Sequence, residues 1–284
     1  MNYRFSLYSL FVSLVLIAAV CLAILSGCSP SAFSSSPESV TFSYRDRILT
    51  AKEGVPVNQL DPSGFSTDEQ GRVQYSADGK QSPTGIDVSF YQQEIDWQAV
   101  AADGIDFAII RLGYRGYTQG GLFTDNLFIQ HIQGALDAGL DVGVYFFSQA
   151  ITPEEAIQEA DYVIDTLDGY PLSYPVVFDW EPIAPGNNAR TDGLDNASLT
   201  QCAKAFCTRI QESGYTPAVY FNQDMGYLSF DLSELTEFSF WLAEYDSKPD
   251  FYYEFSLWQY SSTGTVAGIE GNVDLNLDFS PFVS

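Results

Sequence analysis

The stretch Pro175-Val176-Val177-Phe178-Asp179-Trp180-Glu181-Pro182 decides the fold. Apolar residues run directly into two carboxylates, and a proline stands at each end. A continuous apolar run bounded by turn residues is typical of a strand buried on both faces of a parallel sheet. Because side chains alternate along a strand, Asp179 and Glu181 should point the same way and Trp180 the other way. Such a strand end indicates the functional rim of a barrel, although an isolated Asp-x-Glu could equally combine a turn cap with a solvated glutamate.

From Thr84 onward, strand patterns and helical patterns alternate. The predicted strands are residues 85–91, 107–114, 142–148, 176–181, 217–222, 238–245, 256–260 and 273–277. Amphipathic helices are predicted between the early strands, among them residues 126–138 and a helix opened by the capping box Thr152-Pro153-Glu154-Glu155. After Asn222 the helical patterns fade. Five β/α units followed by three strands predict an α/β protein with an irregular TIM-like (β/α)5(β)3 barrel.

A second capping box, Ser198-Leu199-Thr200-Gln201, precedes a helix whose apolar face carries Cys202 and Cys207. Five residues apart on a helix, their Cα atoms would be separated by about 8.5 Å, beyond the reach of a disulfide. We therefore expect two buried thiols that pack as small hydrophobic groups, with a bridge as the alternative.

Residues 1–28 have the features of an export signal. Arg4 gives a weakly basic start, and the apolar core at residues 10–24 is short for a membrane-spanning helix. Leu25-Ser26-Gly27-Cys28 follows directly and resembles the bacterial lipoprotein signal, in which the cysteine becomes lipidated. An ordinary cleaved signal and an uncleaved anchor are the alternatives. We expect lipid on Cys28 to hold the chain at the extracellular face of the bacterial cell membrane.

Two segments separate this signal from the barrel. Residues 29–40 are rich in serine and proline and are expected to form a flexible tether. Residues 41–83 contain strand patterns at 41–49 and 72–76 and several turn signals, which predict a small β N-terminal extension. The barrel domain is then expected to occupy residues 84–284.

Charge and composition exclude several kinds of partner. The chain of 284 residues has a formal net charge of −25, which argues against nucleic acid. A metal site built from histidine and cysteine is not expected, because His131 is the single histidine and no Cys-x-x-Cys spacing occurs. We expect no cofactor and no metal, a monomeric chain, and a surface or outer-helix position for His131.

Four acidic residues in three of the predicted strands are candidates for a site. Asp87 lies in the first, Asp179 and Glu181 in the fourth, and Asp274 in the eighth. An acidic group within an apolar strand costs free energy unless it is paired. One such residue could be structural, but four of them on one barrel favour a site.

These residues lie in motifs that resemble a known family. The motifs, in order, are Gly85-Ile86-Asp87-Val88-Ser89, Ile95-Asp96-Trp97, Phe107-Ala108-Ile109-Ile110-Arg111, Gly143-Val144-Tyr145-Phe146-Phe147, Phe178-Asp179-Trp180-Glu181, Leu257-Trp258-Gln259-Tyr260, Gly268-Ile269 and Val273-Asp274-Leu275-Asn276. Over about residues 84–284 the chain resembles glycoside hydrolase family 25, the Chalaropsis-type lysozymes or N-acetylmuramidases, which implies the same barrel. One departure is Phe146, where many relatives have histidine, and it bears on a polar subsite contact.

The resemblance implies hydrolysis of the β-1,4 bond between N-acetylmuramic acid and N-acetylglucosamine in peptidoglycan. It implies Glu181 as general acid, with Asp179, Asp87 and Asp274 completing the acidic cluster. Because Asp179 and Glu181 would approach the sugar from one side, attack by the substrate's own 2-acetamido oxygen, oriented by Asp179, fits better than a protein nucleophile. A conventional mechanism with Asp87 or Asp179 as nucleophile stays open.

Five residues near strand ends could line a glycan groove: Tyr145, Tyr220, Trp258, Gln259 and Tyr114. Core packing is the alternative for each aromatic side chain. Two other functions also stay open: a non-catalytic wall-binding lipoprotein on the same barrel, and a glycosidase for another N-acetylated glycan.

Overall fold

The computed structural model describes residues 39–283. The predicted signal at 1–28, its Cys28 and most of the predicted tether at 29–40 lie outside the described residues. The chain divides into two compact units, the first ending at Ala51. Within that first unit, β1 (Thr41–Tyr44) pairs antiparallel with β2 (Arg47–Thr50). Within residues 39–283, no helix has the length and apolar character needed to cross a membrane.

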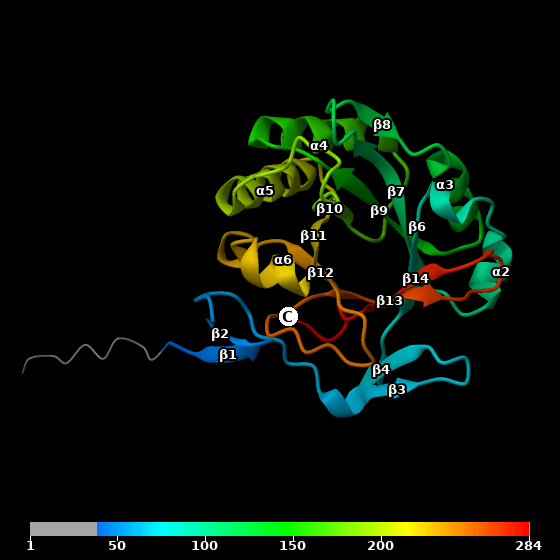
Figure 1. The fold of residues 1–284 in the computed structure, drawn as a ribbon. Coiled ribbons are helices and arrows are strands. Elements are labelled where there is room, and N and C mark those ends of the chain that lie inside the picture. The colour runs from blue at the N-terminus through cyan, green and yellow to red at the C-terminus, as the bar shows by residue number, and fades with distance from the viewer. Residues whose placement is uncertain (1–38, 284) are drawn as a thin grey trace, which may run out of the picture. The chain divides into compact units, whose positions relative to one another are not determined.

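The second unit, Lys52–Ser284, contains a closed ring of eight strands (Figure 1). In ring order these are β6 (Thr84–Val88), β7 (Phe107–Arg115), β9 (Asp141–Ser148), β10 (Val176–Trp180), β11 (Pro217–Asn222), β12 (Ser239–Ala243), β13 (Leu257–Gly264) and β14 (Val273–Asp278). Neighbouring strands are parallel except that β14 runs antiparallel to both β13 and β6. The ring confirms the predicted barrel.

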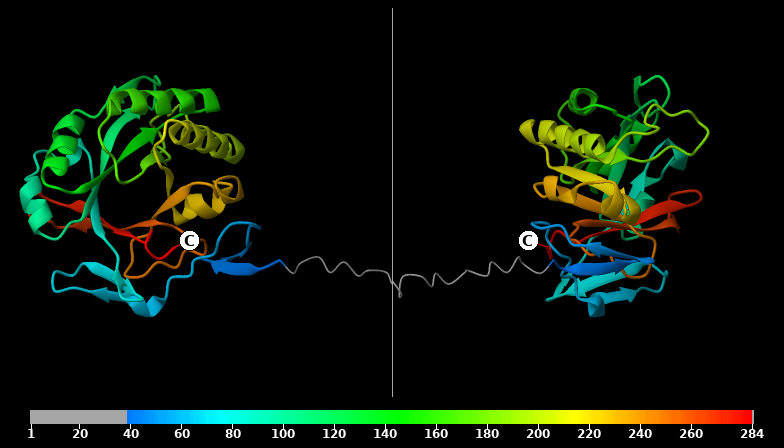
Figure 2. Two further views of the ribbon diagram at one scale, coloured as in Figure 1. Left: turned by 180° about the vertical axis from the view of Figure 1, so that it is seen from behind. Right: turned by 60° about the vertical axis from the view of Figure 1, so that its left-hand side comes forward.

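Helices surround only part of this ring, as both views in Figure 2 show. They are α2 (Trp97–Ala102), α3 (Phe128–Asp137), α4 (Pro153–Leu167), α5 (Asn196–Glu212) and α6 (Gln223–Leu228). Each follows one of the first five ring strands in sequence, whereas β12, β13 and β14 have no α-helix after them. Two 3-10 turns, η2 (Phe90–Gln92) and η3 (Leu232–Glu234), and the short strand β8 (Leu122–Thr124), which pairs with β7, complete the barrel domain.

Strand β10 shows why the acidic residues face the barrel interior. All five of its residues are buried, as the apolar run predicts. Val177 joins the interior cluster formed with Phe107, Ile109, Ala218, Trp241 and Leu257. Phe178 faces outward, with its ring 5.4 Å from that of Phe206 on α5. Because side chains alternate, Asp179 must point inward again, at the end of the strand.

Several predicted boundaries were wrong for local reasons. The first strand ends at Val88, not at residue 91, because Ser89 caps η2 through a capping box with Gln92. The helical pattern does not end at Asn222, whose side chain caps α6 by accepting a hydrogen bond from the Met225 amide at 3.0 Å. The capping box expected at residues 198–201 does not form. Asp195 caps α5 instead, accepting from the Ser198 amide at 2.8 Å.

Residues 52–83 of the second unit cover the side of the ring that lacks helices. They form η1 (Pro62–Gly64) and an antiparallel sheet of β3 (Phe65–Thr67), β4 (Val73–Ala77) and β5 (Lys80–Gln81). The Phe65 ring lies 5.7 Å from Trp258 on β13, and the Tyr75 ring lies 5.3 Å from Phe279 just after β14. This apolar contact takes the place of a helix.

His131 lies within the outer layer of helices and not at the surface. It is fully buried on α3, with its ring 5.9 Å from that of Trp97 on α2, and burial lowers its pKa. Its position on the inner face of α3 explains the burial, because Phe128, Ile132 and Ala135 of the same face are also buried.

The two thiols of α5 are free and buried, as predicted, and this makes them testable. Burial raises the pKa of Cys202 to about 12 and raises that of Cys207 well above its ordinary value. Since the thiolate is the reactive form, neither residue should react with a disulfide reagent in the folded protein. With Cys21 and Cys28 replaced by serine, thiol titration should count no reactive group in buffer and two in guanidinium chloride. Rapid labelling of the folded chain would contradict this.

Candidate active site

Closure of the barrel brings four carboxyl groups together. Asp87 on β6 and Asp274 on β14 are register partners, although 187 positions separate them in the sequence numbering (274 − 87). Because β14 is antiparallel, its first residues lie beside the carboxyl ends of the parallel strands. Asp179 is the fourth residue of β10, and Glu181 follows its last residue. The structure therefore gathers the four acids named in the sequence at one rim of the barrel.

These acids lie where two adjoining hollows meet. The larger hollow, of about 700 Å³, and the smaller, of about 190 Å³, share Asp87, Tyr145, Asp179, Glu181 and Asp274 as lining residues. We call the two together the acid groove. A bound chain that crossed the meeting point would extend into both hollows, with the carboxyl groups at its middle.

Burial and mutual repulsion favour the protonated forms of these acids. Burial, then the charges of Glu181 and Asp87, raise the pKa of Asp179 well above its ordinary value, against the opposing charge of Arg111. Burial, then the charge of Asp274, raise the pKa of Glu181. For Asp274, burial raises the pKa to about 6, although hydrogen bonding with Asp87 works in the other direction. A carboxyl group that stays protonated near neutral pH can act as a general acid.

Asp87 is held by two side-chain amides. Oδ2 of Asp87 accepts hydrogen bonds from Nε2 of Gln259 at 2.9 Å and from Nδ2 of Asn276 at 2.8 Å. Oε1 of Gln259 accepts in turn from the hydroxyls of Tyr220 and Tyr245, at 2.9 and 3.0 Å. Burial and the charge of Asp274 raise the pKa of Asp87 well above its ordinary value, and the hydrogen bonds from Gln259 and Asn276 offset only part of this rise. Asp87 therefore has a fixed orientation toward the cluster.

Four of the five other predicted groove residues line the acid groove. Tyr145 lines both hollows, Tyr114 lines the larger, and Tyr220 and Gln259 line the smaller. Trp258 is a correction, because it is fully buried and faces away from the acid groove. Its ring stacks at 6.2 Å on that of Phe279, and its Nε1 donates to the Glu244 carbonyl at 2.8 Å. Since Gln259 points inward, strand alternation requires its neighbour Trp258 to point outward.

Arg111 is a groove residue that the sequence interpretation did not select. Its Nε donates to Oδ2 of Asp125 at 2.8 Å. Its guanidinium carbon lies 5.0, 5.4 and 5.7 Å from the ring centroids of Phe90, Tyr91 and Tyr114, within the range of cation–π attraction. The signal was present, because a cation directly follows the apolar run of residues 107–110 within the same strand, β7.

Other groove residues carried weaker signals in the sequence. Tyr245 lies just beyond β12, and Trp241 lines the smaller hollow while its Nε1 donates to Oδ1 of Asn276 at 2.9 Å. Phe146, the departure from the family pattern, faces outward, with its ring 6.2 Å from that of Tyr162 on α4. Phe147 lines the groove instead, so the change at position 146 leaves the groove wall intact. Among residues 39–283, no group of histidine, cysteine, aspartate or glutamate is arranged to hold a metal ion.

An acid-lined groove at the carboxyl ends of the strands of an α/β barrel is the arrangement of a barrel glycosidase. The family model for glycosyl hydrolases family 25 matches residues 86–269, and the chain belongs to this family of glycoside hydrolases.

Two curated relatives are named lysozymes. The chain is 28% identical over 193 residues to an autolytic lysozyme of Clostridium acetobutylicum, covering 68% of this chain and 54% of the relative. It is 28% identical over 205 residues to lysozyme M1 of Streptomyces globisporus, covering 68% of this chain and 66% of the relative. The chain thus spans about half of the first relative's length and just under two thirds of the second's.

Solved structures agree on the fold. The spore cortex lytic enzyme SleM of Clostridium perfringens has a TM-score of 0.60 at 23% identity, covering 69% of this chain and 67% of that one. A bacterial lysozyme of Streptomyces coelicolor has a TM-score of 0.55 at 25% identity, covering 68% of this chain and 90% of that one.

The raised pKa of Asp274 predicts how stability depends on pH. Its ordinary value is 3.8 and its folded value is about 6, so protonation stabilises the folded state fully below pH 3.8. That contribution is lost as the pH rises through about 6. Discounted for the partial exposure of the side chain, the loss should be about 1–2 kcal/mol in the free energy of unfolding between pH 4 and 7.

Asp274→Asn should remove this part of the pH dependence, because asparagine stays neutral. Urea unfolding across the range should show the variant gaining on the wild-type chain as the pH rises. Asp137→Asn, the same change at an exposed position of α3, is the control and should follow the wild type. Parallel curves for Asp274→Asn and the wild type would contradict the assignment.

Proposed function

We propose that this chain is a muramidase that hydrolyses the β-1,4 bond between N-acetylmuramic acid and N-acetylglucosamine in peptidoglycan. The observation that carries the proposal is the meeting of Asp87, Asp179, Glu181 and Asp274 in one groove of a family 25 barrel. The two relatives named lysozymes support the same substrate. The same acid cluster argues against a purely wall-binding role, because burying four carboxyl groups is costly and binding alone does not require it.

In the proposed mechanism, Glu181 is the general acid. Its raised pKa favours the protonated form, which can give its proton to the oxygen that leaves the N-acetylmuramic acid ring as the bond breaks. Asp274 contributes by raising that pKa through its charge. After the bond breaks, Glu181 is ionised and can take a proton from the water that attacks the anomeric carbon, which restores the starting state.

Asp179 is assigned to orienting the substrate. It lies two residues before Glu181, and both residues line the acid groove, with Cα atoms about 6.5 Å apart. From that position it can accept a hydrogen bond from the acetamido N–H and direct the acetamido oxygen toward the anomeric carbon. The acetamido group then serves as the nucleophile, forming a cyclic intermediate that water opens.

Glu181→Gln should lower kcat on purified peptidoglycan by about 10³-fold, since the amide cannot donate the catalytic proton. Circular dichroism and binding to insoluble peptidoglycan should be retained. Mass spectrometry of the wild-type products should show N-acetylmuramic acid at the new reducing ends. Glu212→Gln, at an exposed position ending α5, is the matched control and should keep full activity.

Each alternative predicts a different result in this experiment. A wild-type chain that binds peptidoglycan but releases no reducing ends would identify a non-catalytic wall protein. Cleavage of chitin oligomers but not of peptidoglycan would identify another N-acetylated substrate. A glycosyl group trapped covalently on Asp87 or Asp179 would replace substrate assistance with a protein nucleophile.

We also propose that Cys28 is lipidated and anchors the enzyme to the outer face of the cell membrane, near its wall substrate. Cys28 lies outside the described residues, so the support is the signal pattern of residues 1–28. Growth with a fatty-acid label should mark the wild-type protein, and Cys28→Ser should lose the label and leave the membrane fraction. Cys202→Ser should keep both the label and the membrane association. Unlabelled wild-type protein would contradict the proposal.

A further inference from the structure

The proposed general acid, Glu181, lies just beyond the last residue of β10 that pairs with a neighbouring strand. The ladder between β10 and β9 ends at the pair Trp180 and Ser148, and the ladder between β10 and β11 ends at Asp179 and Tyr220. Within residues 39–283, no donor hydrogen-bonds the Glu181 carboxyl group. The direction in which that carboxyl points therefore depends on how its own backbone is held.

Gln149 holds that backbone. It follows the last residue of β9 and is fully buried. Its Nε2 donates to the Glu181 carbonyl at 3.0 Å and to the Ser148 carbonyl at 2.9 Å. Its Oε1 accepts from Oγ1 of Thr191 at 2.9 Å. Because both amide hydrogens and the amide oxygen are used, the Gln149 side chain is held in one orientation.

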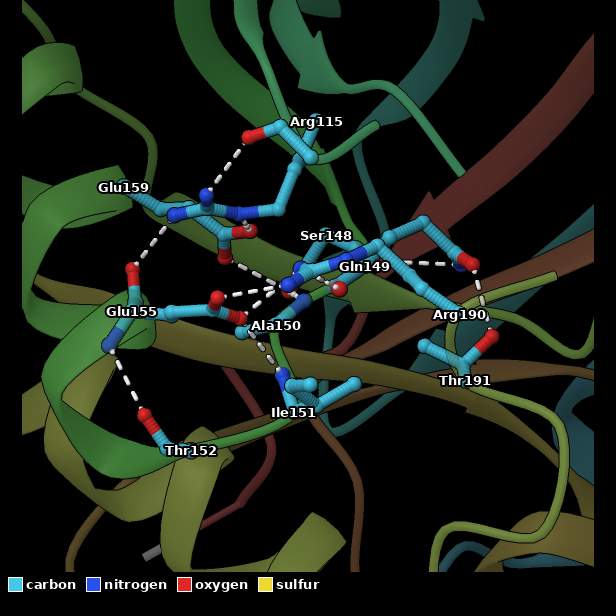
Figure 3. Close-up of polar contacts among 11 residues, drawn as sticks. Arg115, Ser148, Gln149, Ala150, Ile151, Thr152, Glu155, Glu159, Arg190 and Thr191 are labelled. Carbon is cyan, nitrogen blue, oxygen red and sulfur yellow. Dashed lines mark hydrogen bonds and ion pairs between the residues drawn. The ribbon is translucent and has the colours of Figure 1, made fainter. Parts of the chain in front are cut away.

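Gln149 also joins the two ends of the loop that follows the acid. Glu181 and Thr191 flank the loop of residues 182–190, and both form hydrogen bonds with the side-chain amide of Gln149. Arg190 also holds the end of this loop, because its Nη1 donates to the Gln149 carbonyl at 2.8 Å (Figure 3). Arg190 also forms an ion pair with Glu155 of α4 at 2.5 Å.

Helix α4 fixes the segment that carries Gln149 (Figure 3). Ser148 Oγ donates to Oε2 of Glu159 at 2.6 Å, and the Ile151 amide donates to Oε2 of Glu155 at 3.0 Å. Glu159 is itself buried and paired with Arg115 at 2.6 Å. Gln149 is thus attached to a rigid helix on one side and to the acid on the other.

We propose that Gln149 is a positioning residue that sets the direction of the Glu181 carboxyl group. The inference rests on the proposed role of Glu181 as general acid. Proton donation needs the carboxyl oxygen within about 2.6–3.2 Å of the leaving oxygen, and displacements of about 1 Å can lower rates strongly. Asp179 and Trp180 are already held by the ladder, so loss of Gln149 affects the acid selectively.

The test compares two variants with a matched control. Gln149→Met keeps the size of the side chain but removes its hydrogen bonds. Thr191→Val removes only the bond that holds the amide oxygen. Thr200→Val is the same substitution at another buried threonine, whose Oγ1 donates to the Asn196 carbonyl at 2.9 Å within α5 and does not bond to Gln149 or Glu181. All three are made in the full chain.

We expect Gln149→Met to lower kcat on peptidoglycan about tenfold and Thr191→Val about threefold, with KM within twofold of the wild type. Thr200→Val should keep kcat. A glycoside whose leaving group is 4-nitrophenolate needs little protonation, so both variants should lose less activity on a 4-nitrophenyl N-acetylmuramoside than on peptidoglycan.

Three results would overturn the inference: kcat within twofold of wild type for Gln149→Met, a rise in KM with kcat unchanged, or equal losses on both substrates. If Gln149→Met fails to fold, the comparison of Thr191→Val with Thr200→Val decides, and equal kcat values for these two would overturn it. A wild-type chain that releases no reducing ends would instead overturn the proposed function, so the two failures can be told apart.

Discussion

The contact between Asp87 and Asp274 is the constraint on which the rest of the site depends. It exists because β14 closes the ring antiparallel to β6, which places two carboxyl groups side by side at a buried rim. Burying ionised carboxyl groups together is unfavourable, and this raises their pKa because protonation removes the buried charge. The protonated state that lowers the cost of folding is also the state that a general acid requires, so stability and chemistry here have one physical origin.

Two separate polar networks hold the two halves of the cluster. Asp87 is held from the C-terminal strands by Gln259 and Asn276, whose amides are oriented by tyrosine and tryptophan donors. Glu181 is held from the other side of the ring by Gln149 and helix α4. Neither network alone sets the distance between the acids. That distance is fixed by the ring of strands, which explains why a closed barrel suits this cluster better than an open sheet.

The sequence predicted those features that follow from local periodicity. The run into Asp179 and Glu181 indicated a strand buried on both faces, and alternation placed both acids on one side. The same alternation separates Gln259 from Trp258, so these two neighbours cannot both line the groove although both lie near a strand end. The predicted cap of α5 was three residues too late. Ser198 matches the capping-box pattern, but Asp195 caps the helix by accepting a hydrogen bond from the Ser198 amide. The contacts of Asp87 with Gln259 and Asn276 span 172 and 189 positions, and no local pattern reveals them.

Residues 52–83, whose structure the sequence predicted least well, support the active site indirectly. The barrel has no helices over β13 and β14, so the outer face of these strands needs another apolar cover. Phe65 and Tyr75 supply it by packing on Trp258 and Phe279. This packing keeps Trp258 on the outside of β13, and alternation then keeps Gln259 on the inside, where it donates to Asp87. The small sheet therefore supports the acid cluster through the strand between them, although it contributes no residue to the acid groove.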